Sequence, residues 1–495
     1  MAVTSPSVIF LCLLVSSIVL VNAAFVSTNT STTGHEMYVR SPQAPTMNPN
    51  QPGTNGKKPS SPGTGPRVME GGRMEGGKME GGSTTPRNPQ GNGKAVPFGF
   101  GSKATGGGKA TPQTPRDTAE LLAWLTDKVP RVILISKTYD FTVAARNVTA
   151  AACRPWAACS NGAQVQLARN ANNWCSSEKK LPSNIQVSLH SHALDAIKVS
   201  SQKTLLGVGA NAVLKGKGLA LNKVQNVIIQ FKYQVSQPVP AFNYNSQVWG
   251  GDAIMFNGAK DIWIDHCTFS HIGRQMLASG GSSSAEGNAG ITISNNLFSG
   301  KTKWSVKCND KHYWNALFSG PNDSITMARN CIDSTSGRTQ RQEVLEIRRC
   351  FCISEFTGMS LMGEEIPKRL TFFVSYNNLH TNIIGETFQV GRGSDVLAEG
   401  NVYKNVKTQN NNDAKTQVGG RSFVPLKPED ANRCTAALGR PCVPNLMLQS
   451  SNYLFGLDAQ ALTTFRGRPE VTQARAVPAA NIQNGVPGSC GVGFL

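Results

Sequence analysis

The feature that most constrains the fold of this 495-residue chain is a pattern of short strands that recurs from about residue 200 onward. Each copy has a polar start, a run of β-forming residues, an Asn or His, and another apolar residue. A recurrence at roughly 30 residues is typical of coils stacked in a solenoid, and an ordinary multi-stranded sandwich is the alternative. An Asn at a repeated corner can bond the next coil and tolerates left-handed turns. The copies are residues 224–231, 259–269, 289–298, 323–332, 370–379 and 394–403.

The first 95 residues divide into two parts that precede the folded domain. An apolar run over 8–21, followed by Val21-Asn22-Ala23, predicts a secretory signal over residues 1–23. A signal anchor is the alternative, but the run is short for a bilayer span. Residues 24–95 are rich in Gly, Pro, Ser, Thr and Asn, and Met-Glu-Gly-Gly occurs there three times. We therefore expect a secreted protein without a membrane anchor, carrying a disordered spacer.

An ordered domain is expected over 96–495. The segment 114–117 has Thr as a cap, Pro at the first helical position and Asp at the third. It precedes apolar residues at Leu121 and Leu125, so a short helix is predicted to start here. Residues 131–135, Arg-Val-Ile-Leu-Ile, then predict a buried strand.

Charge and cysteine content narrow the functional class. The formal net charge of +19 favours an anionic partner. For a secreted protein an acidic cell-wall polysaccharide fits better than nucleic acid, although charge alone does not distinguish binding from solubility. Cys12 leaves with the signal, so eleven of the twelve cysteines remain and at least one is unpaired. Neither CxxC pairs nor histidines at zinc spacing occur, so disulfides are expected and no metal site is.

Three short motifs carry the candidate chemistry: Trp-Gly-Gly-Asp (249–252), Ile-Gly-Arg-Gln (272–275) and Ser-Gly-Arg-Thr-Gln-Arg (336–341). They place a carboxylate and several guanidinium groups on one face of a repetitive β architecture. Such a face could hold an acidic polysaccharide. Asp252 and Arg274 could pair through a bidentate fork, or form a plain scaffold ion pair.

These motifs resemble those of fungal and oomycete pectin lyases, which belong to the same polysaccharide lyase family as the pectate lyases. The resemblance implies an all-β fold, a right-handed parallel β-helix with a short N-terminal helix and long loops. It covers about residues 96–445. The matching segments are 104–115, 203–219, 248–254, 262–266, 271–275, 307–314, 336–341 and 396–406.

The resemblance also implies a reaction and the residues that perform it. Pectin lyases cleave by β-elimination and place an arginine where pectate lyases hold calcium, so no cofactor and no calcium are expected. Arg274 matches that arginine and Asp252 its carboxylate partner. Arg338 matches the proposed proton-abstracting arginine, and Arg341 stands where a lysine is usual. Because guanidinium is effectively always protonated, either a neighbouring cation and burial lower the pKa of Arg338, or Arg338 stabilises the enolate while another group takes the proton.

Substrate contacts are expected from aromatic rings, because methyl-esterified galacturonan carries less charge than pectate and stacks on apolar surfaces. His312 either orients the cleft or is structural. Trp263 is expected in the core, and Asp265 and His266 in the scaffold. The cleft residues that the resemblance implies are Trp156, Trp174, Trp249 and Trp314.

Covalent features complete the expectations. The resemblance implies the disulfides Cys153–Cys175 and Cys159–Cys308, and we expect Cys434–Cys442 nearer the C-terminus. The sequons at Asn29, Asn147 and Asn322 are candidates for glycosylation.

Residues 343–368 are about 25 more than pectin lyases usually have at this place. They are either a surface excursion or an artefact such as translated intron, and they could disturb Arg338 if they lay in the adjacent wall.

The leading hypothesis is a monomeric, secreted pectin lyase that cleaves methyl-esterified pectin internally without calcium. A calcium-dependent pectate lyase is the first alternative, but the acids it would need around Arg274 are missing. A polygalacturonase would require paired aspartates that do not occur. A wall-binding or effector protein that keeps the β-helix but has lost catalysis is the alternative from another class.

Overall fold

The computed structural model describes the chain from residue 96 onward with several gaps, and all structural statements concern these residues. The predicted signal (1–23), the predicted spacer (24–95), Trp249 and the segment 343–368 lie outside them. The described ranges are 96–143, 147–160, 164–177, 179–190, 195–234, 251–280, 286–342, 371–391, 393–407, 420–450, 456–485 and 490–491.

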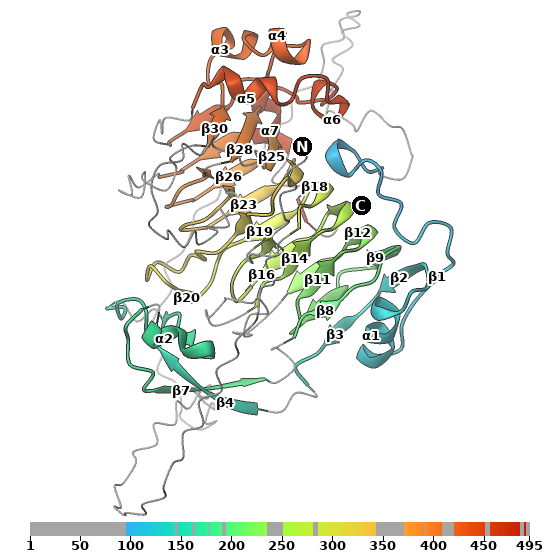
Figure 1. Ribbon diagram of the computed structural model, residues 1–495, viewed down its shortest axis with the longest axis vertical. Coiled ribbons are helices and arrows are strands. Elements are labelled where there is room, and N and C mark those ends of the chain that lie inside the picture. The colour runs from blue at the N-terminus through green and yellow to red at the C-terminus, as the bar shows by residue number, and fades with distance from the viewer. Residues whose placement is uncertain are drawn as a thin grey trace, which may run out of the picture. The chain divides into compact units, whose positions relative to one another are not determined.

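From β8 (Ile197–Lys198) to β19 (Leu297–Ser299), strands that follow one another in the sequence lie in different sheets, whereas strands one coil apart pair in parallel (Figure 1). One coil consists of β15 (Lys260–Asp265), β16 (Thr268–Ser270) and β17 (Leu277–Ser279). Each of these pairs in parallel with the equivalent strand of the next coil. The architecture is therefore a parallel β-helix with three sheets, which confirms the predicted solenoid and excludes the sandwich.

The three parallel sheets of the described chain contain ten, nine and seven strands. The first runs β1 (Pro112–Gln113), β2 (Arg131–Ile135), β9 (Lys203–Gly207), β12 (Gln225–Gln230), β15, β18 (Ala289–Ser294), β22 (Ser324–Ala328), β25 (Thr371–Tyr376), β28 (Ser394–Glu399) and β30 (Arg421–Phe423). The second runs β3 (Thr138–Asp140), β10 (Val213–Lys215), β13 (Lys232–Gln234), β16, β19 (Leu297–Ser299), β23 (Cys331–Asp333), β26 (Leu379–Thr381), β29 (Val402–Lys404) and β31 (Leu446–Leu448).

The third parallel sheet positions the candidate site. Its strands are β8 (Ile197–Lys198), β11 (Leu219–Asn222), β14 (Ile254–Asn257), β17, β21 (Ala316–Phe318), β24 (Arg341–Gln342) and β27 (Gln389–Val390).

Apolar side chains stack in register along the interior of the solenoid. In the first sheet, six residues occupy equivalent positions on successive coils and all are buried. Because each added coil buries another layer of the same stack, the hydrophobic core grows with the number of coils. The six are Val227, Ile262, Ile291, Ile325, Phe373 and Val396.

Five of the six predicted strand copies are in fact two strands separated by a corner, whereas the copy over 224–231 contains β12 alone. Asparagines stack at this corner. The side-chain oxygen of each asparagine accepts hydrogen bonds from the coil before it at 2.8–3.0 Å. Asn295 and Asn377, which precede two of the stacked residues, have φ of 54° and 55°. The two roles expected of the corner asparagine are divided between neighbouring residues, because the ladder asparagine bonds the adjacent coil and the residue before it takes the left-handed conformation. The ladder consists of Asn296, Asn330, Asn378, Asn401 and Asn445.

The N-terminal helix starts later than predicted. α1 covers Thr118–Thr126, and its cap is Asp117 rather than Thr114. Asp117 has extended backbone, and its carboxylate accepts a hydrogen bond from Glu120 N at 2.9 Å, which satisfies a free helical N–H. Leu121 and Leu125 are fully buried, as the apolar spacing predicted. Further along, β2 matches the predicted strand 131–135.

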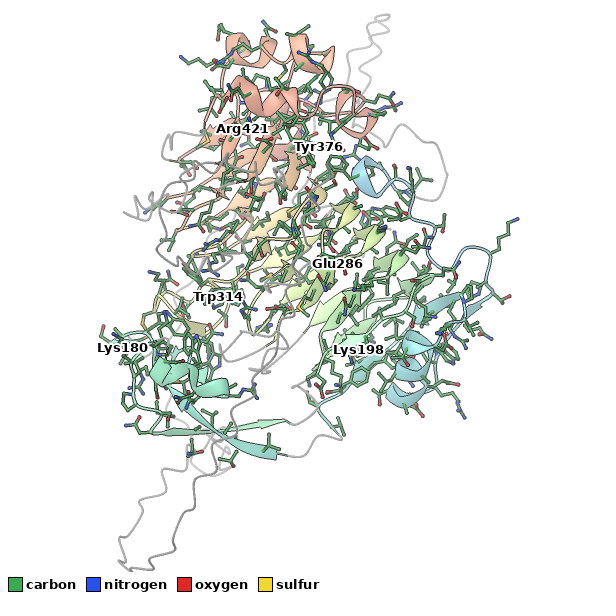
Figure 2. All side chains as sticks on the ribbon, in the orientation of Figure 1. Lys180, Lys198, Glu286, Trp314, Tyr376 and Arg421 are labelled. Carbon is green, nitrogen blue, oxygen red and sulfur yellow. A yellow bond between two sulfur atoms is a disulfide. The ribbon has the colours of Figure 1, made fainter. Side chains whose placement is uncertain are left out.

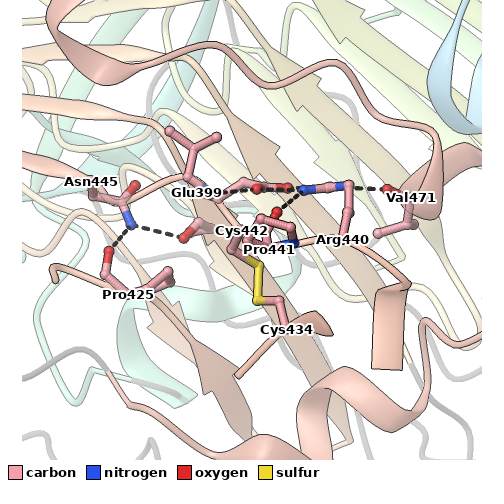
Figure 3. The surroundings of a disulfide bond; sticks show 10 residues. Glu399, Pro425, Cys434, Arg440, Pro441, Cys442, Asn445 and Val471 are labelled. Atoms are coloured by element: carbon pink, nitrogen blue, oxygen red, sulfur yellow. Dashed lines mark hydrogen bonds and ion pairs between the residues drawn. A yellow bond between two sulfur atoms is a disulfide. The ribbon is translucent and has the colours of Figure 1, made fainter. Parts of the chain in front are cut away.

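The C-terminal end of the solenoid is covered by helices that the sequence reading did not predict (Figure 1). In this cap the disulfide Cys434–Cys442 forms as expected, beside Arg440, which donates to both carboxylate oxygens of buried Glu399 at 2.6 and 2.9 Å (Figure 3). These helices bury apolar side chains on the outer face of the first sheet, among them Val374, Leu397 and Phe423. The helices are α3 (Pro428–Asn432), α4 (Thr435–Leu438), α5 (Ala459–Thr463), α6 (Pro469–Thr472) and α7 (Ala479–Gly485).

A long excursion, residues 147–190, leaves the solenoid between β3 and β8 and is fixed by two of the predicted disulfides. Cys153–Cys175 closes the excursion on itself, and Cys159–Cys308 ties it to the solenoid body. A fourth disulfide, Cys331–Cys490, was not predicted. Among the described cysteines only Cys267, which is buried, is free.

The excursion has its own short elements and one strand pair with the body. Within the excursion, β4 pairs antiparallel with β6 and β7. The pairing of β5 with β20 places the excursion against the loop that follows β19. The elements are β4 (Asn147–Cys153), β5 (Gln164–Val165), β6 (Ala168–Arg169), η2 (Ala171–Asn173), α2 (Trp174–Ser177) and β7 (Ile185–His190), with β20 (Trp304–Ser305) in the body and η1 (Gly99–Gly101) near the N-terminus.

The coils on the two sides of the segment 343–370 remain in register. β24, which ends at Gln342, pairs with both β21 and β27, and β25, which begins at Thr371, pairs with both β22 and β28. The segment therefore leaves from a single corner, after β24, whereas Arg338 precedes β24. The ladder next to Arg338 is unbroken.

Candidate active site

Four consecutive coils each contribute one residue to the candidate site, immediately before a strand of the third sheet. Asp252 precedes β14, Arg274 precedes β17, Trp314 precedes β21 and Arg338 precedes β24. These strands are neighbours in the sheet. Backbone bonds continue the stack beyond the strands, from Arg274 N to Gly251 O at 3.0 Å and from the residue after Trp314 to Arg338 O at 3.1 Å. The described parts of the three motifs are therefore brought together.

Asp252 and Arg274 form a buried ion pair. Nη1 of Arg274 donates to both carboxylate oxygens of Asp252, at 3.2 and 3.0 Å, and Gln275 N donates to Oδ1 at 2.9 Å. The Asp252 side chain is 2% exposed and that of Arg274 is 12% exposed. Burial raises the pKa of Asp252, and the Arg274 charge and the Gln275 N–H oppose that rise.

The geometry of this pair differs from the expected fork. A single nitrogen bridges both oxygens, so Nε and Nη2 of Arg274 make no bond to Asp252. The guanidinium is therefore held through one end rather than through its full edge.

His312 contacts the backbone of Arg274 and is buried, with 4% of its surface exposed. Its Nε2 bonds the backbone oxygen of Arg274 at 2.6 Å, so this nitrogen carries the proton. Burial lowers the pKa of His312 to about 4, which keeps the ring neutral. The buried ring bonds the Arg274 backbone, a contact that fits both an orienting and a structural histidine, so the role of His312 stays a prediction.

Trp314 carries the guanidinium of Arg338 on its ring face. Arg338 Cζ lies 4.9 Å from the ring centroid, which is a cation–π distance. The Trp314 ring also meets Trp156 edge-on at 6.3 Å and Tyr313 at 4.8 Å. Arg338 is thus half-buried and held by an aromatic cluster.

A glutamine of the excursion connects that cluster to the ion pair. Oε1 of Gln166 accepts from Trp314 Nε1 at 3.1 Å, and its Nε2 donates to the backbone oxygen of Gly273, next to Arg274. Figure 2 labels Trp314 on the solenoid and Lys180 on the excursion. Gln166 was not among the predicted residues, because nothing in its sequence neighbourhood indicates a contact more than 100 residues away.

Tyr313 and Gly337 were also missed. A Cβ atom on Gly337 would lie about 2.1 Å from the Tyr313 ring, so only glycine allows the ring to pack there. Tyr313 stands directly before Trp314 in the matching segment 307–314, and this adjacency was the available signal.

The remaining predicted site residues are placed differently. Trp174 packs on the Cys153–Cys175 disulfide, in the small core of the excursion. Arg341 lies in β24, in register with Leu317, three residues beyond Arg338. Trp249 lies outside the described residues, so its role remains a prediction.

Predicted scaffold residues behave as expected. Trp263 is 2% exposed, and its Nε1 donates to Ser294 Oγ at 2.9 Å. Asp265 is fully buried and accepts bonds from Ser294 and Asn295. His266 bonds Asp265 at 2.6 Å.

The glycosylation candidates stay predictions. Asn322 is exposed in the turn before β22 and has φ of 61°. Asn147 begins β4, but its side chain is not described, and Asn29 lies outside the described residues.

Two features are absent from the described part of the chain. No three His, Cys, Asp or Glu side chains there come together in a group that could hold a metal ion. No helix there is long and apolar enough to cross a membrane.

Comparison with known proteins places the chain among the polysaccharide lyases. The family model for pectate lyase matches residues 157–347. The probable pectin lyase F of Aspergillus flavus is 37% identical over 404 residues, covering 81% of this chain and 83% of that protein. The probable pectin lyase A of Aspergillus clavatus is 36% identical over 398 residues, covering 80% and 93%.

The chain therefore belongs to the pectate lyase family, and the relatives that it matches over most of its length are named pectin lyases. It is a polysaccharide lyase. A solved pectate lyase from Paenibacillus sp. 0602 also aligns, at 12% identity and a TM-score of 0.49, covering 81% of this chain and 96% of that one.

Proposed function

We propose that this lyase is a secreted pectin lyase that cleaves methyl-esterified galacturonan internally by β-elimination and needs no calcium. The observation that carries the proposal is the buried Asp252–Arg274 pair. Because Asp252 already binds Arg274 and Gln275, its carboxylate is not available to a cation, and the residues do not fit a calcium site.

The proposed reaction begins with loss of the weakly acidic C5 proton, which leaves negative charge on the neighbouring ester group. A fixed cation there lowers the barrier, because its charge opposes the developing enolate in a site of low dielectric. Nε and Nη2 of Arg274, which do not bond Asp252, supply such donors. The glycosidic oxygen then departs from C4 and leaves the 4,5-unsaturated product.

Arg338 is proposed as the second cation of the site. The Trp314 face favours a charged guanidinium. We therefore favour stabilisation of the enolate by Arg338 over removal of the proton by Arg338. Arg341, in the strand that follows, keeps a positive charge close to this position and is proposed to contact the substrate.

Aromatic rings are proposed to hold the esterified sugars. Trp156 and Trp314 meet edge-on beside Arg338, and both belong to the predicted cleft set. Esterified units expose apolar methyl groups that rings accommodate better than charged groups do. Trp174 and Trp249 complete the proposed set, with Trp174 acting through the excursion.

One assay tests the proposal. Purified protein is incubated with highly methylated pectin and a chelator, and the ultraviolet absorbance of the unsaturated product is followed. Product under these conditions supports a calcium-independent pectin lyase, and a rapid fall in viscosity supports internal cleavage. Product only from demethylated substrate with calcium would favour a pectate lyase, and binding without product would favour the inactive wall-binding protein.

A further inference from the structure

A lysine-rich hairpin, residues 300–312, lies next to the candidate site and has no role in the chemistry proposed above. Its two arms meet at an antiparallel bridge between Lys301 and Lys311. Backbone bonds from Thr302 N to Asp310 O at 3.1 Å and from His312 N to Gly300 O at 2.7 Å close it. The hairpin is thus a built structure that ends at His312, the residue beneath Arg274.

The hairpin presents an aromatic ring to solvent. Trp304, in β20, is 39% exposed, whereas the next residue, Ser305, is buried. β20 pairs with β5 of the excursion, and Cys159–Cys308 fixes the two together. A large ring on a rigid strand keeps its position without a partner and costs little entropy to use in binding.

The same hairpin concentrates positive charge. It holds four lysines and one acid, Asp310. Lys301 lies 3.7 Å from Asp333, but within the described residues no acidic side chain pairs with Lys303, Lys307 or Lys311. Lys301 and Lys311 face each other across the hairpin, which is unfavourable for like charges, so the hairpin as a whole favours an anionic partner.

A chain of ring contacts joins this surface to the reacting centre. Lys307 Nζ lies 5.9 Å from the Tyr313 ring. Tyr313 packs at 4.8 Å on Trp314, whose face carries Arg338. Lys307 and Arg338 therefore flank one pair of packed rings, so a polysaccharide bound at Arg338 would pass close to the hairpin.

We propose that Trp304, Lys303 and Lys307 form a subsite for an unesterified galacturonate unit of the substrate. The sugar ring would stack on Trp304 and its free carboxylate would bind the lysines, while the esterified unit that reacts lies at Arg274 and Arg338. This inference rests on the proposed function. Its consequence is a preference for pectin in which an occasional free acid lies near the cleaved bond.

Binding of fully de-esterified oligogalacturonate, which needs no catalysis, tests the subsite separately from the reaction. Affinity is measured by calorimetry at low and high salt for the full chain and for Lys303→Gln/Lys307→Gln. The variant is expected to bind about 2- to 30-fold more weakly at low salt, as for the loss of two exposed ion pairs, and to show a weaker salt dependence. Lys103→Gln/Lys427→Gln, which removes two exposed lysines elsewhere, is the matched control.

A second readout uses graded substrates. The ratio of KM for partly methylated to fully methylated pectin should rise in Lys303→Gln/Lys307→Gln, and thermal unfolding should show both variants folded. Equal losses of affinity in the two double variants, or an unchanged affinity in the hairpin variant, would overturn the subsite. A chain that binds de-esterified oligomers through the hairpin but yields no product from methylated pectin would keep the subsite and refute the proposed reaction.

Discussion

The charge of Arg274 matters to the folded state as well as to the proposed reaction. Its partner Asp252 is buried, and a buried carboxylate is tolerated only while it is paired and hydrogen-bonded. His312 adds a further contact to this pair. Its neutral ring donates a hydrogen bond to the backbone oxygen of Arg274 and so holds the backbone that carries the guanidinium. Stability and chemistry are therefore coupled at this residue.

Substituting Arg274 with alanine should affect both properties. We expect a loss of about 3–5 kcal/mol in unfolding free energy, because a charge is left unpaired in the interior. We also expect a fall of about 10²–10³ in kcat, as for removal of one group that stabilises an anionic transition state. Asp252→Asn/Arg274→Gln should recover most of the stability but not the activity.

Arg421→Ala is the control for this prediction. Arg421 pairs with buried Asp395 at 2.6 Å, outside the candidate site. The Arg421→Ala variant should be less stable than the parent, but kcat of the protein that remains folded should be unchanged. If Asp252→Asn/Arg274→Gln regained activity along with stability, Arg274 would be a scaffold residue only.

Acid should destabilise the protein through buried neutral histidines. Burial lowers the pKa of His380 to about 3, and its ring stacks on Tyr403 at 4.9 Å. An unfolded histidine titrates near 6.5, so between pH 6.5 and pH 3 the unfolded chain binds a proton that the folded chain does not. Stability is therefore complete above pH 6.5 and falls as the pH drops through this window.

His380→Phe should flatten that acid limb. The expected gain relative to the parent is on the order of 3 kcal/mol between pH 7 and pH 4, measured from unfolding midpoints across this range. His312, with a pKa of about 4, titrates in the same window, so some dependence should persist. Parallel curves for the parent and the variant would contradict the assigned role of His380.

At the level of elements, the corner asparagines determine how one coil follows another. Asn296 and Asn330 each donate from the backbone N–H and from the side-chain amide to the side-chain oxygen of the asparagine on the next coil. The buried corner is thus satisfied without water, and the left-handed residue before it turns the chain.

Asn330→Ala removes the second of the five asparagines in this ladder. It leaves the N–H groups of Asn296 without their acceptor, and we expect a cost of about 1–3 kcal/mol for each buried group left unsatisfied. Asn222→Ala, which loses only an exposed amide bond to Asn257, should change stability by less than about 0.5 kcal/mol. Denaturant unfolding measures both, and similar values for the two would contradict the ladder's role.

The excursion acts on the site through Gln166. Gln166→Ala removes both the Trp314 and the Gly273 bonds while the disulfides still hold the excursion. We expect kcat to fall about 10-fold, as for a small misplacement of a positioned cation, with thermal stability lowered by only a few degrees. Gln166→Glu keeps the acceptor for Trp314 and should retain more activity. Unchanged kinetics in Gln166→Ala would remove Gln166 from the site.

Periodic features were predictable from the sequence, whereas contacts between distant segments were not. The strand copies, the corner asparagines and the buried strand 131–135 follow from local patterns. The helix start moved to Asp117 because that carboxylate reaches Glu120 N, and the sequence alone does not decide between Thr114 and Asp117, which both carry a capping oxygen. The bond from Gln166 and the disulfide Cys331–Cys490 join residues more than 100 positions apart and leave no local pattern.

At the level of the whole molecule, the solenoid tolerates long segments at its corners because each coil is held by its neighbours. The corner between the third and first sheets spans residues 258–259 after β14 but residues 280–288 after β17. Pairing on both sides stays regular despite this difference. A longer segment at such a corner raises the entropic cost of closing the loop, and this cost grows slowly with the length of the segment.

This regularity predicts that the segment 343–370 can be removed. A chain that joins Gln342 to Thr371 through the five residues found at the corner after β21 (319–323) should fold with a melting temperature within about 3 °C of the parent. Because β24 and β25 keep partners on both sides, kcat on methylated pectin should change by less than about two-fold. Activity that appeared only after removal would mean that the segment obstructs the site, and a chain that failed to fold would mean that it supports the solenoid. Sequencing the transcript alongside shows whether the natural message contains the segment.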